Sequence, residues 1–373
     1  FGLFILHTKT GEHLFGGCQA AVNKFIGFAN EGNKLVFGPL ANSELLGKTF
    51  GPGDAFLFVI VVTGTVILIS AVSSLLYHYN ILQVIVRAMA WVMRLVMGTS
   101  GSETLSAAAN IFMGQTEAPL VIKPYLARMT RSELNCMMVG GFATIAGGVM
   151  AVYSGVLHIP AGHLLTASVM SAPAALLMAK VLVPETEISE TAAGANAKIE
   201  RETINGIDAI CTGAGDGMKL AINVTAMLIG FTSIVAVANW LLGWLLGHVG
   251  WHNDQPLQTI LGYLNAPFAW AMGVPTKDCL AVGQILGERI VLNEFIGYLS
   301  LAKQQATLDP RSYTIATYAL CGFANLASVA IQIGGIGALV PGRRSDLATL
   351  GMKAMVGGLL ASYMTACVCG VLL

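Results

Sequence analysis

The chain has 373 residues, of which 55% are hydrophobic and 11% are charged, and its mean hydropathy is +0.71. Soluble domains carry about 25% charged residues, so this composition is not that of a soluble domain and indicates a multi-pass membrane protein. The 20 Lys and Arg balance the 20 Asp and Glu, which leaves no basic surplus to suggest a nucleic-acid partner.

Hydropathy and charge divide the chain into five segments. Interfacial helices with a scaffold span are predicted at residues 1–97, followed by a transport repeat at 98–183 and a polar cytoplasmic linker at 184–217. A second scaffold span is predicted at residues 218–256 and a second transport repeat at 257–373. The apolar start at residues 1–6 is interpreted as the tail of an earlier span, so further N-terminal spans are expected before it.

Six stretches are predicted to cross the bilayer once each, because about 20 apolar residues span its hydrocarbon core. They are residues 55–76, 134–157, 161–180, 218–248, 313–341 and 347–373. Nine basic residues then share one side, which the positive-inside rule makes cytoplasmic: Arg87, Arg94, Lys123, Arg128, Arg131, Lys198, Arg201, Arg343 and Arg344. The same topology predicts an outer position for Lys277, Arg289, Lys303 and Arg311.

Glu117 is the only ionisable residue between residues 104 and 122, and it lies between two helix breakers, Gly114 and Pro119. A charge at membrane depth costs at least about 2.5–3.5 kcal/mol, so it usually marks a ligand or ion path. Broken helices are tolerated in membranes only where they face protein or a watery cavity. The pattern favours a polar re-entrant tip; a polar surface loop between two short helices is the alternative.

A second carboxylate, Glu294, lies in another apolar stretch, and a shared motif follows each carboxylate. The motif is Gly-Phe-Ala-[Thr/Asn]-[Ile/Leu]-Ala, at residues 141–146 and 322–327. Matching interrupted segments in two halves are typical of transporters whose site lies at the repeat interface. The sequence therefore predicts an all-α polytopic membrane protein with inverted repeats, whose two carboxylates meet near the bilayer centre.

Several motifs resemble those of the concentrative nucleoside transporter family. They are Gly-Gln-Thr-Glu-Ala-Pro at 114–119, Ser-Val-Met-Ser-Ala-Pro at 168–173, Pro-Glu-Thr-Glu at 184–187, Asn-Glu-Phe at 293–295 and Ala-Leu-Cys-Gly-Phe-Ala-Asn at 319–325. The resemblance implies a cell-membrane symporter that imports nucleosides with sodium or, in some relatives, with protons. It also implies a homotrimer, in which a transport domain of two re-entrant hairpins and two partly unwound helices moves like an elevator.

The chemistry of these residues suits a nucleoside. An ionised Glu294 can accept hydrogen bonds from two ribose hydroxyls, and Asn325 and Ser328, three residues apart, can reach the same sugar from one helix face. The resemblance implies that the base is contacted by Gln115, Thr116 and Glu117 and that the sugar is contacted by Glu294, Asn325 and Ser328. It also implies that the apolar side chains of Val149 and Phe323 line the pocket. For Ser328, a hydroxyl bonded back to its own helix is the alternative.

Sodium is expected as the coupling ion, with no cofactor. The resemblance implies that Asn110 and Thr144 contribute side-chain oxygens and that Met113 and Ile145 contribute backbone carbonyls, the ligand types that unwound helices offer to sodium. From chemistry alone, Asn110 also suits a helix-end cap. Proton coupling stays open, because Glu117 or Glu294 can in principle carry a proton.

Two other functions compete with a symporter. Gly213-Ala214-Gly215-Asp216 matches the bare GxGD pattern of intramembrane aspartyl proteases, but such chemistry needs a second Asp in another span. The remaining Asp residues lie at span edges or in polar stretches, so the chain is predicted not to be an enzyme. A passive channel would need no coupling ion, and its flux would not respond to an ion gradient.

Overall fold

The computed structural model describes residues 8–50, 57–192, 203–248, 250–251 and 253–373. The expected tail of an earlier span at residues 1–6, as well as Lys198 and Arg201, lie outside these residues. The described residues form α-helices and short 3-10 helices. The α-helices are α2 (Lys9–Phe37), α3 (Ser43–Phe50), α4 (Phe58–His78), α5 (Ile81–Met97), α6 (Gly101–Asn110), α7 (Ala118–Val121), α8 (Arg131–Ala143), α9 (Gly147–Val156), α10 (Ala161–Leu182), α11 (Gly206–Gly247), α12 (Pro256–Ala271), α13 (Cys279–Val291), α14 (Glu294–Lys303), α15 (Pro310–Leu320), α16 (Leu326–Leu339) and α17 (Arg344–Leu372).

Within the described residues, five helical stretches are long and apolar enough to cross a membrane. They are Val59–His78, Arg131–Gly155, Ala161–Leu182, Gly206–Gly247 and Pro341–Leu372. The predicted all-helical membrane protein with several apolar spans is therefore confirmed. The predicted single span over residues 313–341 is instead two helices, α15 and α16, separated by a break.

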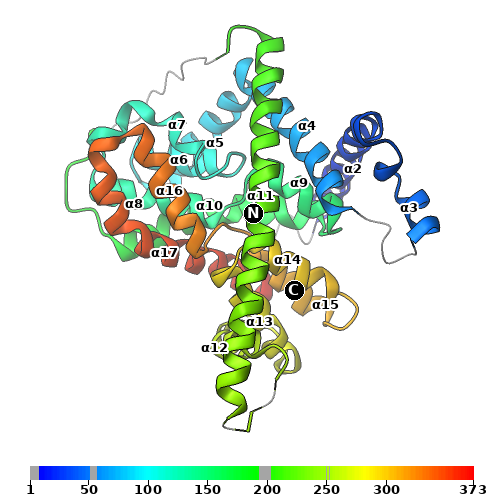
Figure 1. The fold of residues 1–373 in the computed structure, drawn as a ribbon. Coiled ribbons are helices and arrows are strands. Elements are labelled where there is room, and N and C mark those ends of the chain that lie inside the picture. The colour runs from blue at the N-terminus through cyan, green and yellow to red at the C-terminus, as the bar shows by residue number, and fades with distance from the viewer. Residues whose placement is uncertain (1–7, 51–56, 193–202, 249, 252) are drawn as a thin grey trace.

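Helix α11 is the longest element and runs the full height of the molecule in Figure 1. Its 42 residues extend about 63 Å at 1.5 Å per residue, well beyond a hydrocarbon core of about 30 Å. The helix begins at Gly206, so residues 206–217, which are predicted from sequence to belong to the linker, are helical. Asn205 caps this start by accepting a hydrogen bond from the Asp208 amide at 2.9 Å.

Glycines allow α11 to pack closely against α4. A Cβ atom added at Gly213 would lie 2.6 Å from the Ser70 carbonyl oxygen, and one added at Gly217 would lie 2.8 Å from the Ile67 Cα. Small residues at a four-residue spacing commonly let membrane helices approach each other. The neighbouring Asp216 is exposed and pairs with Lys219 at 2.9 Å. The GxGD pattern is thus part of a helix-packing surface.

Two helix breaks share one geometry. Helix α8 ends at Ala143 and α9 begins at Gly147, whereas α15 ends at Leu320 and α16 begins at Leu326. Thr144, with φ −124° and ψ 167°, and Asn325, with φ −139° and ψ 165°, hold the same motif position and have the same extended backbone. The repeated motif therefore marks a repeated interruption of a helix.

The breaks lie where two hydrophobic cores meet. The first core draws side chains from α9, α13, α14 and α15, and the second draws them from α6, α8, α16 and the second half of α10. Phe323 packs against the first core, whereas the adjacent Ala324 belongs to the second. A Cβ atom at Gly322 would lie 2.6 Å from the Phe142 carbonyl oxygen, so this close approach of the α15–α16 break to α8 requires glycine.

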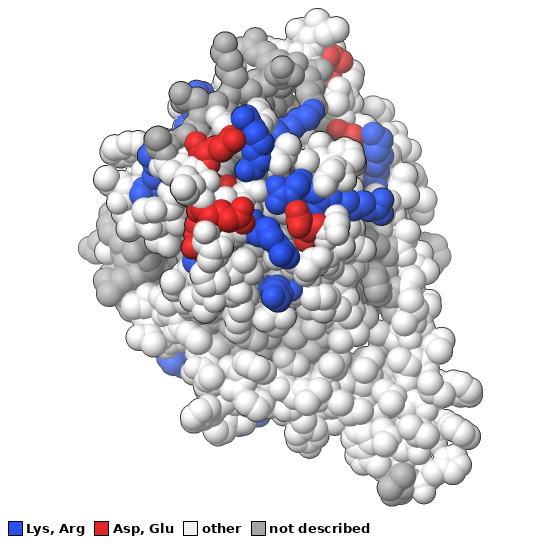
Figure 2. Space-filling view, turned by 90° about the vertical axis from the view of Figure 1, so that its left-hand side faces the viewer, with Lys and Arg blue, Asp and Glu red and all other residues white. Residues whose placement is uncertain are grey.

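Charged side chains gather in one part of the face shown in Figure 2, and the rest of that face is largely uncharged. An exposed ion pair joins Arg128 to Glu190 at 3.2 Å, and a partly buried one joins Arg343 to Asp346 at 2.7 Å. Each such pair contributes about 0–1 kcal/mol at most. Their segregation leaves the uncharged surface that contact with lipid requires.

Candidate functional site

Helix N-termini position the two central side chains of the site. Glu294 is the first residue of α14, where the positive end of the helix dipole stabilises a carboxylate. The cap of this helix is Asn293, whose side chain accepts from the Ile296 amide at 3.0 Å. Asn325 caps α16 in the same way, accepting from the Ser328 amide at 2.8 Å. Each of these helices therefore begins directly after an asparagine cap, a few residues beyond the end of the preceding helix.

Glu294 is buried, with 6% of its surface exposed, and two neutral side chains donate to it. The Tyr153 hydroxyl, from α9, lies 2.9 Å from Oε1, and Asn325 Nδ2 lies 3.0 Å from Oε2. A carboxylate has about four acceptor positions, so these two donors leave room for further ones. Glu294 and Asn325, both predicted from sequence, therefore contact each other.

Gln115 extends this contact into a chain of hydrogen bonds. Its Nε2 donates to Ser328 Oγ at 3.2 Å, and its Oε1 accepts from Gln332 Nε2 at 3.1 Å. Ser328 thus bonds to a side chain 213 residues away, in contrast to a hydroxyl that bonds only to its own helix. The structure brings together four predicted residues, Gln115, Ser328, Asn325 and Glu294.

Thr116 and Glu117 lie differently from Gln115, because both side chains are exposed. Glu117 Oε2 accepts from the Gly114 amide at 3.2 Å, within its own turn. Thr116 lies beside Gly335 of α16, where an added Cβ atom would be 2.9 Å from Thr116 Cγ2. The tip predicted from Gly114 and Pro119 is therefore a turn packed on α16, with its carboxylate accessible.

Asn110 and Thr144 end two neighbouring helices, α6 and α8. A Cβ atom added at Gly140 would lie 3.0 Å from Asn110 Nδ2, so the two helices are in close contact there. Asn110 Nδ2 donates to the Ser106 carbonyl, while its buried Oδ1 has no hydrogen-bond partner among the described residues. The Thr144 hydroxyl donates to the Gly140 carbonyl at 3.0 Å, which leaves its oxygen lone pairs available.

The other predicted sodium and pocket residues fall in the same region. Met113 and Ile145 are buried, and the tip around Met113 is joined to the α8–α9 break by a bond from the Gly147 amide to the Phe112 carbonyl at 3.0 Å. Val149 and Phe323 are partly buried against the first hydrophobic core. An unpartnered amide oxygen beside a helix break fits a sodium ion, which prefers oxygen ligands of this kind.

Arg289 occupies a position that the predicted topology does not anticipate. The topology assigns it to the outer side, but its side chain is fully buried in α13. It donates to the Ala319 carbonyl and, at 3.0 Å, to Ser362 Oγ. Ala319 lies at the end of α15, where the dipole is negative, so a cation there stabilises the interrupted helix. Its position in an apolar stretch, five residues before Glu294, was the feature of the sequence that could have indicated a buried role for Arg289.

Tyr153 and Gln332 also belong to the site and were not singled out from sequence. Both are fully buried, and each is one of only two polar side chains in a mainly apolar helix. Sequence alone indicates that such groups need partners, because an unpaired buried polar group is destabilising. It does not indicate which of many distant residues supplies the partner.

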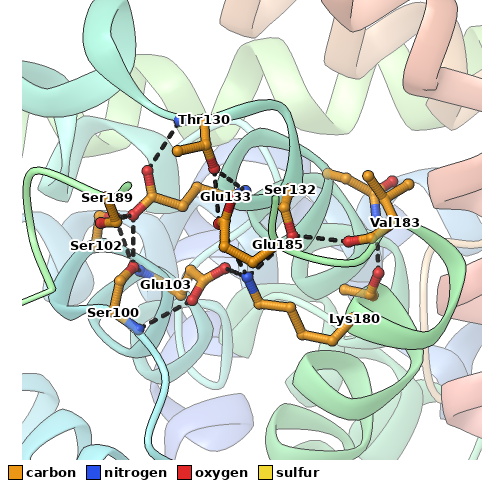
Figure 3. A network of polar contacts seen from close by, with 12 residues as sticks. Ser100, Ser102, Glu103, Thr130, Ser132, Glu133, Lys180, Val183, Glu185 and Ser189 are labelled. Carbon is orange, nitrogen blue, oxygen red and sulfur yellow. Dashed lines mark hydrogen bonds and ion pairs between the residues drawn. The ribbon is translucent and has the colours of Figure 1, made fainter. Parts of the chain in front are cut away.

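A second buried polar cluster lies at the start of α6 and α8 (Figure 3). Glu133 Oε1 accepts from four hydroxyls, those of Ser100, Ser102, Ser189 and Thr191. Its Oε2 accepts from the Thr130 amide at 2.9 Å. Lys180 pairs with Glu103 at 2.5 Å and with Glu185 at 3.3 Å. These bonds fasten residues 185–191, which follow α10, to the hairpin that begins with α6.

The fold and the site together define a multi-pass membrane transporter with a polar chain buried among interrupted helices. Family profiles agree: residues 163–370 match the C-terminal part of Na+ dependent nucleoside transporters, residues 59–160 match a nucleoside recognition profile, and residues 1–40 match the N-terminal part of Na+ dependent nucleoside transporters. The chain belongs to the concentrative nucleoside transporter family, the sodium-dependent nucleoside transporters. It is a transporter and not an enzyme, which excludes the protease alternative.

Individual relatives match over the whole chain. An uncharacterized transporter of Haemophilus influenzae is 41% identical, covering 99% of this chain and 88% of the relative. The sodium/nucleoside cotransporter 1 of Rattus norvegicus is 37% identical, covering 100% of this chain and 58% of the relative. The solved structure of CNTnw in an inward-facing, substrate-bound state is 39% identical, with a TM-score of 0.93 over 100% of this chain and 88% of that one. A CNTnw variant in an outward-facing state has a TM-score of 0.94 at 38% identity, with the same coverage of both chains.

Proposed function

We propose that this protein imports nucleosides such as uridine across the cell membrane by symport with sodium. The buried Glu294 carboxylate carries this proposal, because Tyr153 and Asn325, the two side chains that donate to it, are neutral and it retains acceptor capacity. Two adjacent ribose hydroxyls match such an acceptor in charge and spacing, and charge-assisted bonds are the stronger kind. Asn325 and Ser328, which are bonded to each other, extend the same polar surface toward the sugar.

The base is assigned to the opposite end of the hydrogen-bonded chain. Gln115 lies there, 3.2 Å from Ser328 Oγ, and Thr116 and Glu117 follow it at the exposed tip. Accessible donors and acceptors at this tip suit the edge of a base, either directly or through water. Val149 and Phe323 supply the apolar wall on which a flat ring packs.

Sodium is the proposed coupling ion, bound by Asn110, Met113, Thr144 and Ile145. The buried, unpartnered Asn110 Oδ1 supports this assignment, because such an atom is unfavourable unless a ligand satisfies it. The Thr144 hydroxyl leaves lone pairs free. The tip that carries Gln115 is bonded to the α8–α9 break through Phe112 and Gly147, so ion and nucleoside would be bound by the same two elements.

Alternating access is proposed to be an elevator movement within a homotrimer. Residues 98–183 and 257–373 form the inverted transport repeats, with re-entrant hairpins α6–α7 and α13–α14, and residues 1–97 and 218–256 form the scaffold. The inward- and outward-facing states described for CNTnw support such a movement. Exposed apolar side chains on α11, such as Trp240 and Ile229, suit contact with lipid or with neighbouring protomers.

Uptake into proteoliposomes tests the coupling. Purified protein that elutes as a single species is reconstituted, and labelled uridine is supplied with an inward sodium gradient. Uptake above the equilibrium level is expected, with loss of that accumulation when choline replaces sodium or when a sodium ionophore is added. A folded protein that transports no nucleoside would refute the proposal.

The alternatives have distinct outcomes in the same experiment. Accumulation that persists in choline and follows an imposed proton gradient would identify a proton symporter, with Glu117 or Glu294 as the proton carrier. Equilibration of uridine at a rate that no gradient changes would identify a passive channel. Competition by unlabelled purine and pyrimidine nucleosides would then define the base preference.

A further inference from the structure

Gln332 is a fully buried amide of α16 whose orientation is set by a backbone group. Its Nε2 lies 3.1 Å from the Met138 carbonyl oxygen in α8 and 3.1 Å from Gln115 Oε1. A backbone carbonyl can only accept a hydrogen bond, so the group that faces it must be the NH2 end of Gln332. The second hydrogen of that NH2 group then points to Gln115, whose facing atom must be the carbonyl oxygen.

This orientation of Gln332 determines the orientation of Gln115. With Oε1 of Gln115 turned to Gln332, its Nε2 lies on the other side and donates to Ser328 Oγ at 3.2 Å. An amide nitrogen carries two hydrogens, so one donor of Gln115 remains for another group. Without Gln332, the two ends of the Gln115 amide are nearly equal in size, and a hydroxyl such as that of Ser328 can pair with either.

The packing around this pair leaves little freedom. A Cβ atom added at Gly141 of α8 would lie 2.7 Å from Gln332 Nε2 and 3.0 Å from Gln115 Cβ. A residue larger than glycine at this position would push both amides out of line. The glycine therefore makes space for an amide pair that joins α16, α8 and the tip after α6.

The far end of the chain is anchored by another acceptor. Glu294 Oε2 accepts from Asn325 Nδ2 at 3.0 Å, so Asn325 Oδ1 faces away and accepts from the Ser328 amide. The hydrogen-bonded chain thus ends on both sides at a group that can only accept. These groups are the Met138 carbonyl and an ionised Glu294. Between them every amide has one defined orientation, in which the sugar end presents an acceptor and the base end presents a donor.

We infer that Gln332 is a positioning residue for substrate selection, which fixes Gln115 with its N–H donor toward the base. This inference rests on the proposed function, in which Gln115 contacts the base. The site then selects nucleosides whose base offers a good acceptor, a carbonyl oxygen or an unprotonated ring nitrogen, at that point. Gln332 itself does not touch the substrate.

Thio-substituted uridines test this selection, because sulfur keeps the shape of the base and is a weaker acceptor than oxygen. Dissociation constants of uridine, 2-thiouridine and 4-thiouridine are measured by calorimetry with the full chain in nanodiscs and saturating sodium. The wild-type protein is expected to bind at least one thio analogue about tenfold more weakly than uridine. In Gln332→Met, that ratio is expected to fall below about threefold, with uridine still bound.

A matched control variant is Gln83→Met in α5. Gln83 is also buried and has an Oε1 without a partner among the described residues, but its Nε2 donates to the Tyr77 carbonyl of α4 at 2.7 Å and not to Gln115. This variant is expected to keep the wild-type ratio. Gln332→Glu, which keeps the shape and removes the NH2 group, replaces Gln332→Met if the latter is not a single species by size-exclusion chromatography.

Each result bears on the inference. The inference is supported if the ratio of the thio-analogue and uridine dissociation constants falls in the Gln332 variant but not in Gln83→Met. A wild-type ratio in a Gln332 variant, or equal binding of all three nucleosides by the wild-type protein, overturns it while leaving nucleoside transport intact. Absence of nucleoside binding in the wild-type protein would instead refute the proposed function, and the inference with it.

Discussion

Two carboxylates, Glu133 and Glu294, are both buried in this structure but differ in their partners. Glu133, with 2% of its surface exposed, receives four hydroxyls and one backbone amide. Glu294, with 6% exposed, receives one hydroxyl and one amide side chain. Saturated acceptors hold a fold together, whereas an acceptor with spare capacity can bind a polar ligand.

The cations near the two carboxylates differ in the same way. Lys180 lies between Glu103 and Glu185, with direct ion pairs to both (Figure 3). Arg289, the buried cation closest in sequence to Glu294, donates instead to the Ala319 carbonyl and to Ser362. In the Glu133 cluster, Lys180 offsets part of the negative charge of its two carboxylate neighbours, whereas the side chains that donate to Glu294 are neutral. The comparison predicts that substitutions around Glu133 lower the stability of the fold and that substitutions around Glu294 weaken nucleoside binding.

The largest expected effect is that of Glu294→Gln on nucleoside binding. The loss of two charge-assisted bonds to ribose hydroxyls is expected to weaken uridine binding about 100-fold, or about 3 kcal/mol. The side chain keeps its size and can still pair with Tyr153, so the unfolding temperature is expected to change by only a few degrees. Calorimetric titration and thermal unfolding of the same sample check both parts. Wild-type affinity in this variant would remove Glu294 from the sugar site.

Lys180→Met is expected to show the opposite pattern. It leaves Glu103, with 2% of its side chain exposed, without its cation, and the free energy of unfolding is expected to fall by about 2 kcal/mol. The uridine dissociation constant of the folded fraction should stay within about twofold of the wild-type value. Denaturant unfolding and calorimetry measure the two quantities. A large loss of affinity with unchanged stability would mean that this cluster belongs to the substrate site.

The sequence was sufficient for the features that depend on local chemistry. Glu117 and Glu294 stand out because charges are rare in apolar stretches, and the motif shared by residues 141–146 and 322–327 marks two breaks of equal geometry. The start of α11 was predicted poorly, since glycines and Asp216 before residue 218 look like a linker. Packing of those glycines against α4 overrides their low helix propensity.

The partners of the site residues were beyond the reach of the sequence. Tyr153 lies 141 residues from Glu294, and Gln332 lies 217 residues from Gln115. A polar side chain in an apolar helix indicates that a partner exists, but only the three-dimensional packing identifies it. The capping boxes at Ser100–Glu103 and Thr130–Glu133 are the exception, because the pattern Ser/Thr-x-x-Glu is visible locally.

Asn110→Ala sharpens the comparison at the proposed ion site. Removal of the unpartnered Oδ1 is expected to raise the sodium concentration for half-maximal uptake about tenfold, because one ligand oxygen is lost. Uptake at saturating sodium should stay near the wild-type rate. The matched control is Asn135→Ala: Asn135 is buried, donates to the Ala179 carbonyl at 3.2 Å and also has an unpartnered Oδ1. Equal sodium dependence of the two variants would contradict the assignment.

The smallest expected effect is that of Tyr153→Phe, which removes one of the two side-chain donors that hold Glu294. The carboxylate remains bonded to Asn325, so its orientation is loosened and not lost, and uridine binding is expected to weaken about fivefold, or about 1 kcal/mol. Tyr298→Phe is the control, since the Tyr298 hydroxyl donates to the Thr317 carbonyl at 2.9 Å and its ring lies 4.6 Å from that of Tyr153. It should lower the unfolding temperature without changing the dissociation constant. If both variants bind uridine equally, the Tyr153 hydroxyl only stabilises the fold, as the hydroxyls that donate to Glu133 do. The affinity of Glu294 for the sugar would then not depend on it.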